Sequence, residues 1–191
     1  NISLNQGSPT LLTLARLEKR KGHALILKSI MNLKKYFPDI QYIIAGEGEE
    51  LDSIKNKIKE YNLQDNVNLV GTVNENQKNY IFSNTDLMIM PTLDKSSAKS
   101  IEGFGIAYIE AASFKIPSIA SDVGGTPEAV IHNKTGLIIK EIDELDKAIK
   151  SLLDNKEIRL NLGQNAKIRA ENELNWDIQI KKYNELIKEI Q

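Results

Sequence analysis

Several residue types that mark particular chemistries are absent from this sequence or scarce in it. The 191 residues include no cysteine, which excludes disulfide bonds and thiolate metal sites. Two histidines cannot make a metal site by themselves; we expect His23 to pack or to cap a helix, and His132 to lie in a surface turn. The formal net charge is −1, so no strong overall field would attract nucleic acid, and we expect no nucleic-acid partner.

Long hydrophobic segments are also missing. No apolar run approaches the roughly 20 residues that span a bilayer, and residues 1–6 lack the basic and then apolar pattern of a signal peptide. We therefore expect a cytoplasmic location. The chain does not begin with methionine, which indicates a piece of a longer protein.

What the chain does contain is an alternation of strand and helix patterns. Hydrophobic residues make up 41% and charged residues 27%, values that suit one well-packed globular domain or slightly more. Short apolar runs predict strands at residues 10–15, 40–45, 66–71, 86–90, 116–120 and 136–139. Helical spacing predicts helices at residues 23–36, 50–61, 74–84, 143–154, 156–172 and 176–190, with shorter ones after residues 105 and 125. This order predicts a doubly wound α/β fold, in which a parallel sheet of about six strands has helices on both faces.

Polar residues and glycines follow most of the predicted strands. In an open parallel sheet, ligands bind beyond the carboxyl ends of the strands. The loops at residues 16–22, 46–48, 71–73 and 121–125, and the loop from residue 92 onward, should therefore crowd one edge. The two glycines at 124–125 suit turn geometry and backbone donation to a ligand equally well.

The chain is organised around residues 101–110, where two carboxylates, Glu102 and Glu110, flank the turn Gly103-Phe104-Gly105. The turn opens a helix, and the unpaired amides at a helix start, together with the helix dipole, form a seat for an anion such as phosphate. Carboxylates accept hydrogen bonds from hydroxyls, which sugars present in pairs. A polyhydroxylated ligand that also carries phosphate fits this combination.

Each of these features has a purely structural alternative. Arg16 and Lys21 could be a solvated surface pair, but their place directly after a buried strand favours phosphate binding. Glu102 could cap a helix, and Glu110 could lie on a solvated helix face. Gly46 could be a plain turn residue, because a lone Gly-x-Gly is a weak signal.

Taken together and in order, the motifs resemble the C-terminal half of a retaining glycosyltransferase with the GT-B fold, of family 4 or group 1. The resemblance covers nearly the whole chain. It rests on Leu14-Ala15-Arg16-Leu17 with Lys21-Gly22, Ile44-Ala45-Gly46-Glu47-Gly48, residues 67–71, residues 86–92, Glu102-Gly103-Phe104-Gly105 through Glu110, Ala120-Ser121 with Gly124-Gly125-Thr126-Pro127-Glu128, Thr135-Gly136-Leu137 and Asn175-Trp176-Asp177.

The resemblance implies a role for each matching side chain. Arg16 and Lys21 would hold the diphosphate of a nucleotide-sugar donor. Glu102 would hydrogen-bond the hydroxyls of the transferred sugar, and Glu110 those of the ribose. Glu102, Arg16 and Lys21 would be the catalytic residues. Members of the family usually act without a bound metal, so no metal and no cofactor are expected.

The resemblance also implies contacts that are largely made by backbone. The amides at the helix start would support the diphosphate, and the turn after the third strand would meet the base. These positions are Gly103, Phe104, Gly105 and Ile106 at the helix start, Gly71, Thr72 and Val73 at the base turn, and Gly46.

The implied fold is one Rossmann-like half of a GT-B enzyme. Residues 1–174 would form the donor-binding domain, and residues 175–191 a helix that crosses back to an absent N-terminal domain. The implied reaction transfers the sugar, with retention of configuration, to an acceptor sugar or glycolipid in bacterial polysaccharide or lipopolysaccharide synthesis. This chain alone would be inactive or weakly active, and membrane contact at the inner face would come through the absent half.

Two other functions stay open at this point. One is a non-catalytic, regulatory nucleotide-sugar-binding module, which the combination of Arg16, Lys21, Glu102 and Glu110 argues against. The other is a different GT-B enzyme, such as a nucleotide-sugar epimerase, against which the Glu-Gly-Phe-Gly context argues. The sequence does not specify the base, the sugar or the acceptor.

Two residues depart from the family pattern. Alanine stands at position 15, where glycine is frequent, and a small residue still fits there. Lys115 stands where the family usually has glycine; if it adopts the left-handed conformation, we expect it to cost on the order of 1 kcal/mol.

Overall fold

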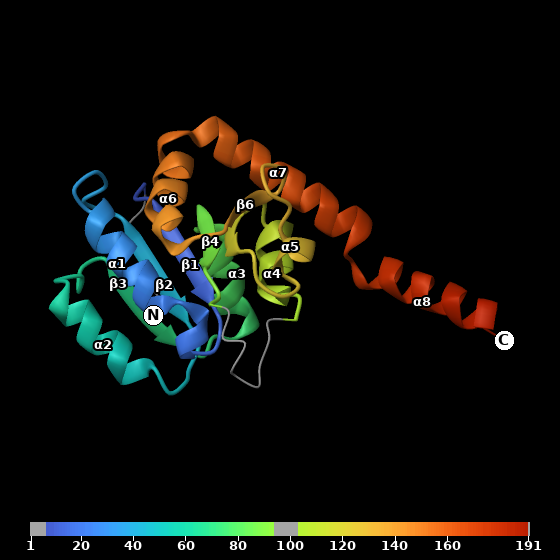
Figure 1. Cartoon of the computed structure of the whole chain (residues 1–191), viewed down its shortest axis with the longest axis horizontal. Helices are drawn as coiled ribbons and strands as arrows, with labels where there is room; N and C mark the ends of the chain where they lie inside the picture. The colour runs from blue at the N-terminus through green and yellow to red at the C-terminus, as the bar shows by residue number, and fades with distance from the viewer. Residues whose placement is uncertain (1–6, 94–102, 191) are drawn as a thin grey trace.

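The chain folds around one parallel sheet of six strands, seen in Figure 1. The computed structural model describes residues 7–93 and 103–190. The strands are β1 (Thr10–Leu14), β2 (Gln41–Ala45), β3 (Val67–Gly71), β4 (Leu87–Met90), β5 (Ser118–Ser121) and β6 (Gly136–Ile139). Their order across the sheet is β3-β2-β1-β4-β5-β6. The fold class predicted from the sequence is therefore confirmed.

The sheet reverses its winding direction between β1 and β4. β1 pairs in parallel with β2 over five residues and with β4 on its other side, so the chain winds outward in one direction and then in the other. A reversal of this kind leaves a crevice at the carboxyl ends of the two central strands. The functional site is therefore expected at the ends of β1 and β4.

Helices cover both faces, and each face has its own hydrophobic core. One face packs against α1 (His23–Leu33), α2 (Leu51–Glu60) and α6 (Leu145–Asp154). The other packs against α3 (Glu75–Ser83), α4 (Ile106–Ser113) and α5 (Thr126–Ala129). All residues of β2 and β4 are buried, which is why these strands read as continuous apolar runs and not as alternating ones.

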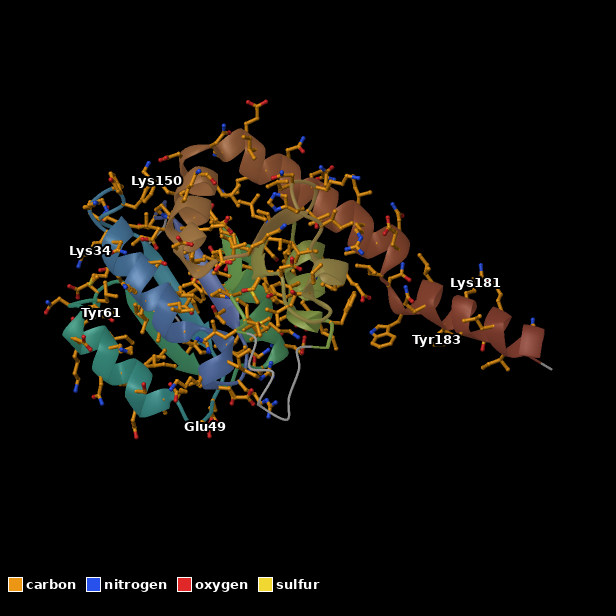
Figure 2. The ribbon with its side chains drawn as sticks, viewed as in Figure 1. Lys34, Glu49, Tyr61, Lys150, Lys181 and Tyr183 are labelled. Atoms are coloured by element: carbon orange, nitrogen blue, oxygen red, sulfur yellow. The ribbon has the colours of Figure 1, made fainter. Side chains whose placement is uncertain are left out.

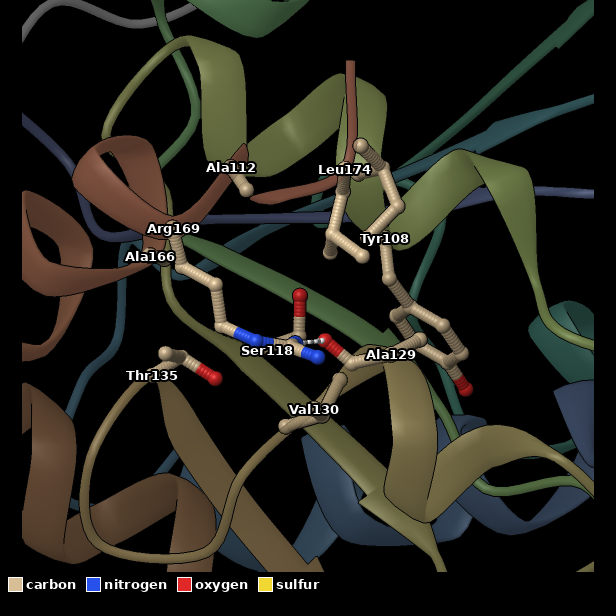
Figure 3. Close-up of a pocket in the computed structure, with 10 residues that line it drawn as sticks. Tyr108, Ala112, Ser118, Ala129, Val130, Thr135, Ala166, Arg169 and Leu174 are labelled. Atoms are coloured by element: carbon tan, nitrogen blue, oxygen red, sulfur yellow. Dashed lines mark hydrogen bonds between the residues drawn. The ribbon is translucent and has the colours of Figure 1, made fainter. Parts of the chain in front are cut away.

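The helix α7 (Lys156–Glu173) runs along α4 and is fixed to α5 by a single arginine. The Arg169 guanidinium donates from Nη1 to the carbonyl oxygen of Ala129 at 2.8 Å, and from Nη2 to that of Glu128 at 2.6 Å. Figure 3 shows this side chain reaching from α7 toward Ala129. These hydrogen bonds satisfy carbonyls at the end of α5, a helix too short to do so itself.

The helix α8 (Trp176–Ile190) projects away from the body of the molecule, as Figure 1 shows. Large apolar side chains along it are more than half exposed: Trp176, Ile180, Tyr183, Leu186 and Ile187. In Figure 2, Lys181 and Tyr183 leave the helix on opposite sides, as expected for an amphipathic helix. None of the helices in the described ranges is both long enough and apolar enough to cross a bilayer.

The C-terminal ends of α1 and α4 bear on two expectations from the sequence. The helix α1 ends at Leu33, short of the predicted residue 36. The helix α4 ends in a left-handed residue, Lys115, with φ of 62°. The amide of Lys115 bonds the carbonyl of Ala112 at 2.9 Å, and that of Ile116 bonds Ala111 at 3.1 Å, which is a Schellman motif. Lys115 therefore adopts the left-handed conformation in which a lysine was expected to be unfavourable.

Candidate functional site

The backbone beyond the ends of β1, β2 and β3 is joined into one continuous edge. The amide of Ala15 donates to the carbonyl of Ala45 at 3.0 Å, and that of Leu17 donates to Glu47 at 2.8 Å. On the other side, the amide of Gly46 donates to the carbonyl of Gly71 at 2.8 Å. The loops after three strands are thus held against one another, as the sequence predicted for the carboxyl edge.

Gly46 is required for this close approach. Its φ is 141°, and a Cβ atom at this position would lie 2.0 Å from the carbonyl oxygen of Ala15. Any side chain would therefore push the loop after β2 away from the loop after β1. This glycine is more than a plain turn residue.

A cavity of about 430 Å³ opens above this edge. It brings together five of the residues predicted to bind the donor, namely Arg16, Gly46, Thr72, Val73 and Glu110. The other lining residues are Leu14, Ala15, Ala45, Glu47, Glu75 and Lys78. Loops after β1, β2 and β3 and side chains from α3 and α4 therefore face one space.

The two basic residues of the first loop differ in burial. The Arg16 side chain is 73% exposed and pairs with Glu18 at 2.9 Å. Because an exposed pair of this kind is worth only about 0–1 kcal/mol, the guanidinium can turn to an anion in the cavity at little cost. Lys21 is buried, and its Nζ lies 3.7 Å from the Met90 sulfur at the end of β4.

The start of α4 is anchored at the same strand end. Gly105 precedes the helix with φ of 82°, and a Cβ atom there would lie 2.6 Å from the Tyr108 ring. The Tyr108 hydroxyl donates to the carbonyl oxygen of Met90 at 2.8 Å. Lys21 and the first turn of α4 thus approach the end of β4, where the crevice of the sheet is expected.

Glu110 has a partner that the sequence did not reveal. Lys78 of α3 donates to Glu110 Oε1 at 2.7 Å and lies 2.9 Å from Glu75 Oε1. The hydrogen bonds to Glu110 and then to Glu75 raise the pKa of Lys78 above its usual value. One weak signal was available: Glu75 and Lys78 have the i,i+3 spacing of a helical ion pair, directly after the predicted base turn.

His23 is a buried packing residue beneath the site, as expected from the sequence. Its Nδ1 lies 3.4 Å from the Tyr42 hydroxyl, which is 2.8 Å from the Thr13 hydroxyl. Burial lowers the pKa of His23 to about 4, because an imidazolium inside the core loses its hydration.

The remaining predicted positions do not line this cavity. Gly71 adjoins it through its hydrogen bond with Gly46, and Lys21 lies beside Met90 at the end of β4. Phe104 and Ile106 line a separate groove of about 640 Å³ beside Trp176. Gly103 meets the loop after β5, where a Cβ atom on Gly125 would lie 1.7 Å from its carbonyl oxygen. Glu102 lies outside the described residues. Within the described part of the chain, no three His, Asp or Glu side chains gather as metal ligands would.

Comparison with known proteins gives a consistent family. The model of the family described as glycosyl transferases group 1 matches residues 1–169. The chain is similar to the GDP-mannose-dependent alpha-(1-6)-phosphatidylinositol monomannoside mannosyltransferase of Mycobacterium tuberculosis, with 27% identity over 171 residues. That alignment covers 88% of this chain and 44% of the relative.

Solved structures share the fold. Sucrose-phosphate synthase from Thermosynechococcus elongatus has a TM-score of 0.84 and 26% identity over 98% of this chain and 46% of its own. HepE of Anabaena, solved with UDP and glucose, has a TM-score of 0.82 at 19% identity, covering 95% of this chain and 48% of its own. The chain spans about half the length of the curated relatives it matches.

Proposed function

The chain belongs to the glycosyl transferases group 1, and we propose that it is the donor-binding half of a glycosyltransferase that uses a nucleoside diphosphate sugar. One observation carries this proposal: the loops after β1, β2 and β3 converge with Glu110 on a single cavity that has Arg16 at its edge. That arrangement offers positive charge for a diphosphate, backbone for a base and a carboxylate for ribose hydroxyls in one place.

The chemistry follows from charge that develops on the leaving group. When the bond between sugar and diphosphate breaks, the diphosphate gains negative charge. In this proposal Arg16, Lys21 and the amides at the start of α4 stabilise that charge as hydrogen-bond donors. In this proposal Glu102 holds the hydroxyls of the transferred sugar, and the sugar passes to its acceptor with retention of configuration.

The rest of the protein would supply the acceptor site. We place the boundary between the donor domain and its crossover helix after residue 174, where α7 has ended and α8 has not begun. The exposed apolar side chains of α8, and the groove that Phe104 and Ile106 share with Trp176 and Tyr183, would then face the other half. An acceptor sugar or glycolipid of bacterial surface polysaccharide fits this setting, and any peripheral membrane contact would come from the other half.

Titration calorimetry with UDP-, GDP- and ADP-sugars, and with the free diphosphates, tests the proposal. Lys21→Met should weaken binding of the free nucleoside diphosphate by roughly tenfold or more, because it removes a charge-assisted contact. Lys19→Met is the matched control, since Lys19 is exposed in the same turn, and it should change affinity little.

Glu102→Gln tests the separate role of the sugar contact. It should reduce discrimination between sugars while leaving free diphosphate binding nearly unchanged, because the carboxylate is assigned to the sugar alone. Equal losses in Lys21→Met and Glu102→Gln for every ligand would contradict the assigned roles. Failure of the unmodified chain to bind any of the diphosphates would contradict the proposed function itself.

A further inference from the structure

Lys78 forms a bridge between two helices at the wall of the cavity. Its ammonium group lies between the carboxylate of Glu75, one turn earlier on α3, and that of Glu110 on α4. The Lys78 side chain is 20% exposed and that of Glu110 is 33% exposed, whereas Glu75 is 80% exposed. All three residues line the cavity that holds Arg16.

The two ion pairs are not equivalent. The pair with Glu75 is local and exposed, so it contributes little to the stability of α3. The pair with Glu110 joins two helices, is better shielded from water and has the shorter distance, 2.7 Å. Lys78 therefore contacts both carboxylates, and its contact with Glu110 is the one that links α3 to α4.

The helix α3 is capped at its start and packed against α4 near its end. The Asn74 side chain accepts from the Gln77 amide at 2.9 Å, and the Gln77 side chain accepts from the Asn74 amide at 3.0 Å, which is a capping box. Farther along, Phe82 of α3 stacks on Phe114 at the end of α4, with ring centroids 5.1 Å apart. The two helices are therefore held together at one end by packed rings and at the cavity end by Lys78.

The contact leaves Glu110 able to accept more hydrogen bonds. An ionised carboxylate has about four acceptor sites. Within the described part of the chain, Lys78 is the one side chain that hydrogen-bonds to Glu110, through Oε1. Two neighbouring hydroxyls of a ribose can use the remaining sites without displacing the lysine.

We propose that Lys78 is a positioning residue for the donor site: it fixes the Glu110 carboxylate in the orientation that receives the ribose hydroxyls. The inference rests on the proposed function and adds to it a source of selectivity for ribonucleotides over deoxyribonucleotides. Lys78 acts through Glu110 and not by attraction to the diphosphate. Replacing Lys78 should therefore change the preference for ribose over deoxyribose more than it changes the overall affinity for the nucleotide.

The test compares UDP, GDP and ADP with their 2′-deoxy counterparts by titration calorimetry, using the base that binds best. The unmodified chain should prefer the ribonucleotide by roughly tenfold or more, since the deoxy compound loses a hydrogen bond to a charged group. In Lys78→Met the preference should fall to about threefold or less, and Lys78→Arg should recover most of it. Lys55→Met, which removes an exposed i,i+3 pair with Asp52 on α2, is the control and should keep the original preference.

Circular dichroism on each variant establishes that it is folded. Lys78→Arg retains the positive charge, so it tests whether the charge beside Glu110 restores the preference. A ribo-to-deoxy preference in Lys78→Met equal to that of the unmodified chain would overturn the inference while leaving the proposed function standing. Equal weakening of both nucleotides would overturn it as well, because it would assign Lys78 to the diphosphate. No binding of any diphosphate by the unmodified chain would overturn the proposed function, and the inference with it.

Discussion

Lys115 follows α4 in the left-handed conformation, which residues other than glycine disfavour. Its φ of 62° places the Cβ atom close to its own backbone, which costs an L-residue about 1–2 kcal/mol. The same conformation at the end of α2 is adopted by Asn62, with φ of 53°, and asparagine tolerates it better. The sequence analysis noted lysine at a position where the family usually has glycine. The left-handed backbone at this position explains why glycine suits it.

Lys115→Gly is therefore expected to raise the free energy of unfolding by roughly 0.5–1 kcal/mol. The relief of strain exceeds the extra entropy that glycine gives the unfolded chain. Asn62→Gly is the matched control at an equivalent helix end and should gain less. Guanidinium unfolding of the three proteins measures the difference; a Lys115→Gly protein less stable than the unmodified chain would show that the lysine side chain makes a compensating contact.

His23 gives the protein a defined dependence on pH. Its pKa is about 4 in the folded state and 6.5 when solvated, so between these values the unfolded state binds a proton that the folded state does not. This contribution to stability is fully present above pH 6.5 and is lost as the pH falls toward 4. The loss amounts to on the order of 3 kcal/mol.

Replacing His23 with glutamine should remove that contribution. The difference in unfolding free energy between about pH 7 and about pH 4.5 should be smaller in His23→Gln than in the unmodified chain, by roughly 2 kcal/mol. The titrating carboxylates are common to both proteins, so their effects cancel in the comparison. Identical pH profiles by urea unfolding would mean that the histidine is not buried in its neutral form.

At the scale of elements, all six strands and the long helices could be predicted from the sequence. Buried parallel strands read as short apolar runs, and α6 has its buried residues at helical spacing. The 3-10 turn Lys19–Lys21 could not be predicted, because three basic residues carry no apolar pattern. Its shape depends on Gly22 at its end and on a distant contact, in which the Leu93 amide donates to the carbonyl of Arg20 at 2.7 Å.

The packing of α7 against the end of α4 depends on a glycine whose role the sequence did not show. A Cβ atom on Gly163 would lie 2.0 Å from the carbonyl oxygen of Lys115. Nearby, Ala112, Ala166 and Ala170 form a cluster of small buried residues that keeps the two helices close. A glycine inside a helix is ordinarily a weakness, but here it permits the contact.

Gly163→Ala should therefore destabilise the protein, against the ordinary preference of helices for alanine. The expected loss is about 1–3 kcal/mol, because α7 must move away from the α4 end to admit the methyl group. Asn165→Ala, at an exposed position two residues later, is the control and should be neutral or gain a few tenths of a kcal/mol. Thermal and denaturant unfolding distinguish the two signs; a more stable Gly163→Ala protein would mean that the helices are not in close contact.

At the scale of the whole molecule, the sheet topology determines how much of the site was predictable. Arg16, Gly46, Thr72 and Val73 directly follow strands, so a parallel sheet brings them to one edge whatever the details of packing. Lys78 was missed because a lysine on a short polar helix reads as a solvated face, and its partner Glu110 is 32 residues away. Pairings between helices depend on tertiary packing that local patterns do not encode.

A further cleft, similar in size to the donor cavity, lies at the opposite edge of the sheet. It measures about 490 Å³ and is lined by polar residues around the start of β1 and β4, including Asp86 and Arg159. Size therefore does not distinguish the two edges. What distinguishes them is the direction of the strands, together with the salt bridge that joins Arg159 to Asp86 at 3.0 Å and engages both charges.

Hydrogen–deuterium exchange with and without saturating nucleoside diphosphate compares the two edges in one measurement. Donor binding at the carboxyl edge predicts slower amide exchange at residues 14–16, 45–47, 71–73 and 105–107, with residues 7–10 and 83–86 unchanged. Protection confined to residues 7–10 and 83–86 would contradict it, because the ligand would then occupy the edge that lacks Arg16, Lys21 and Glu110.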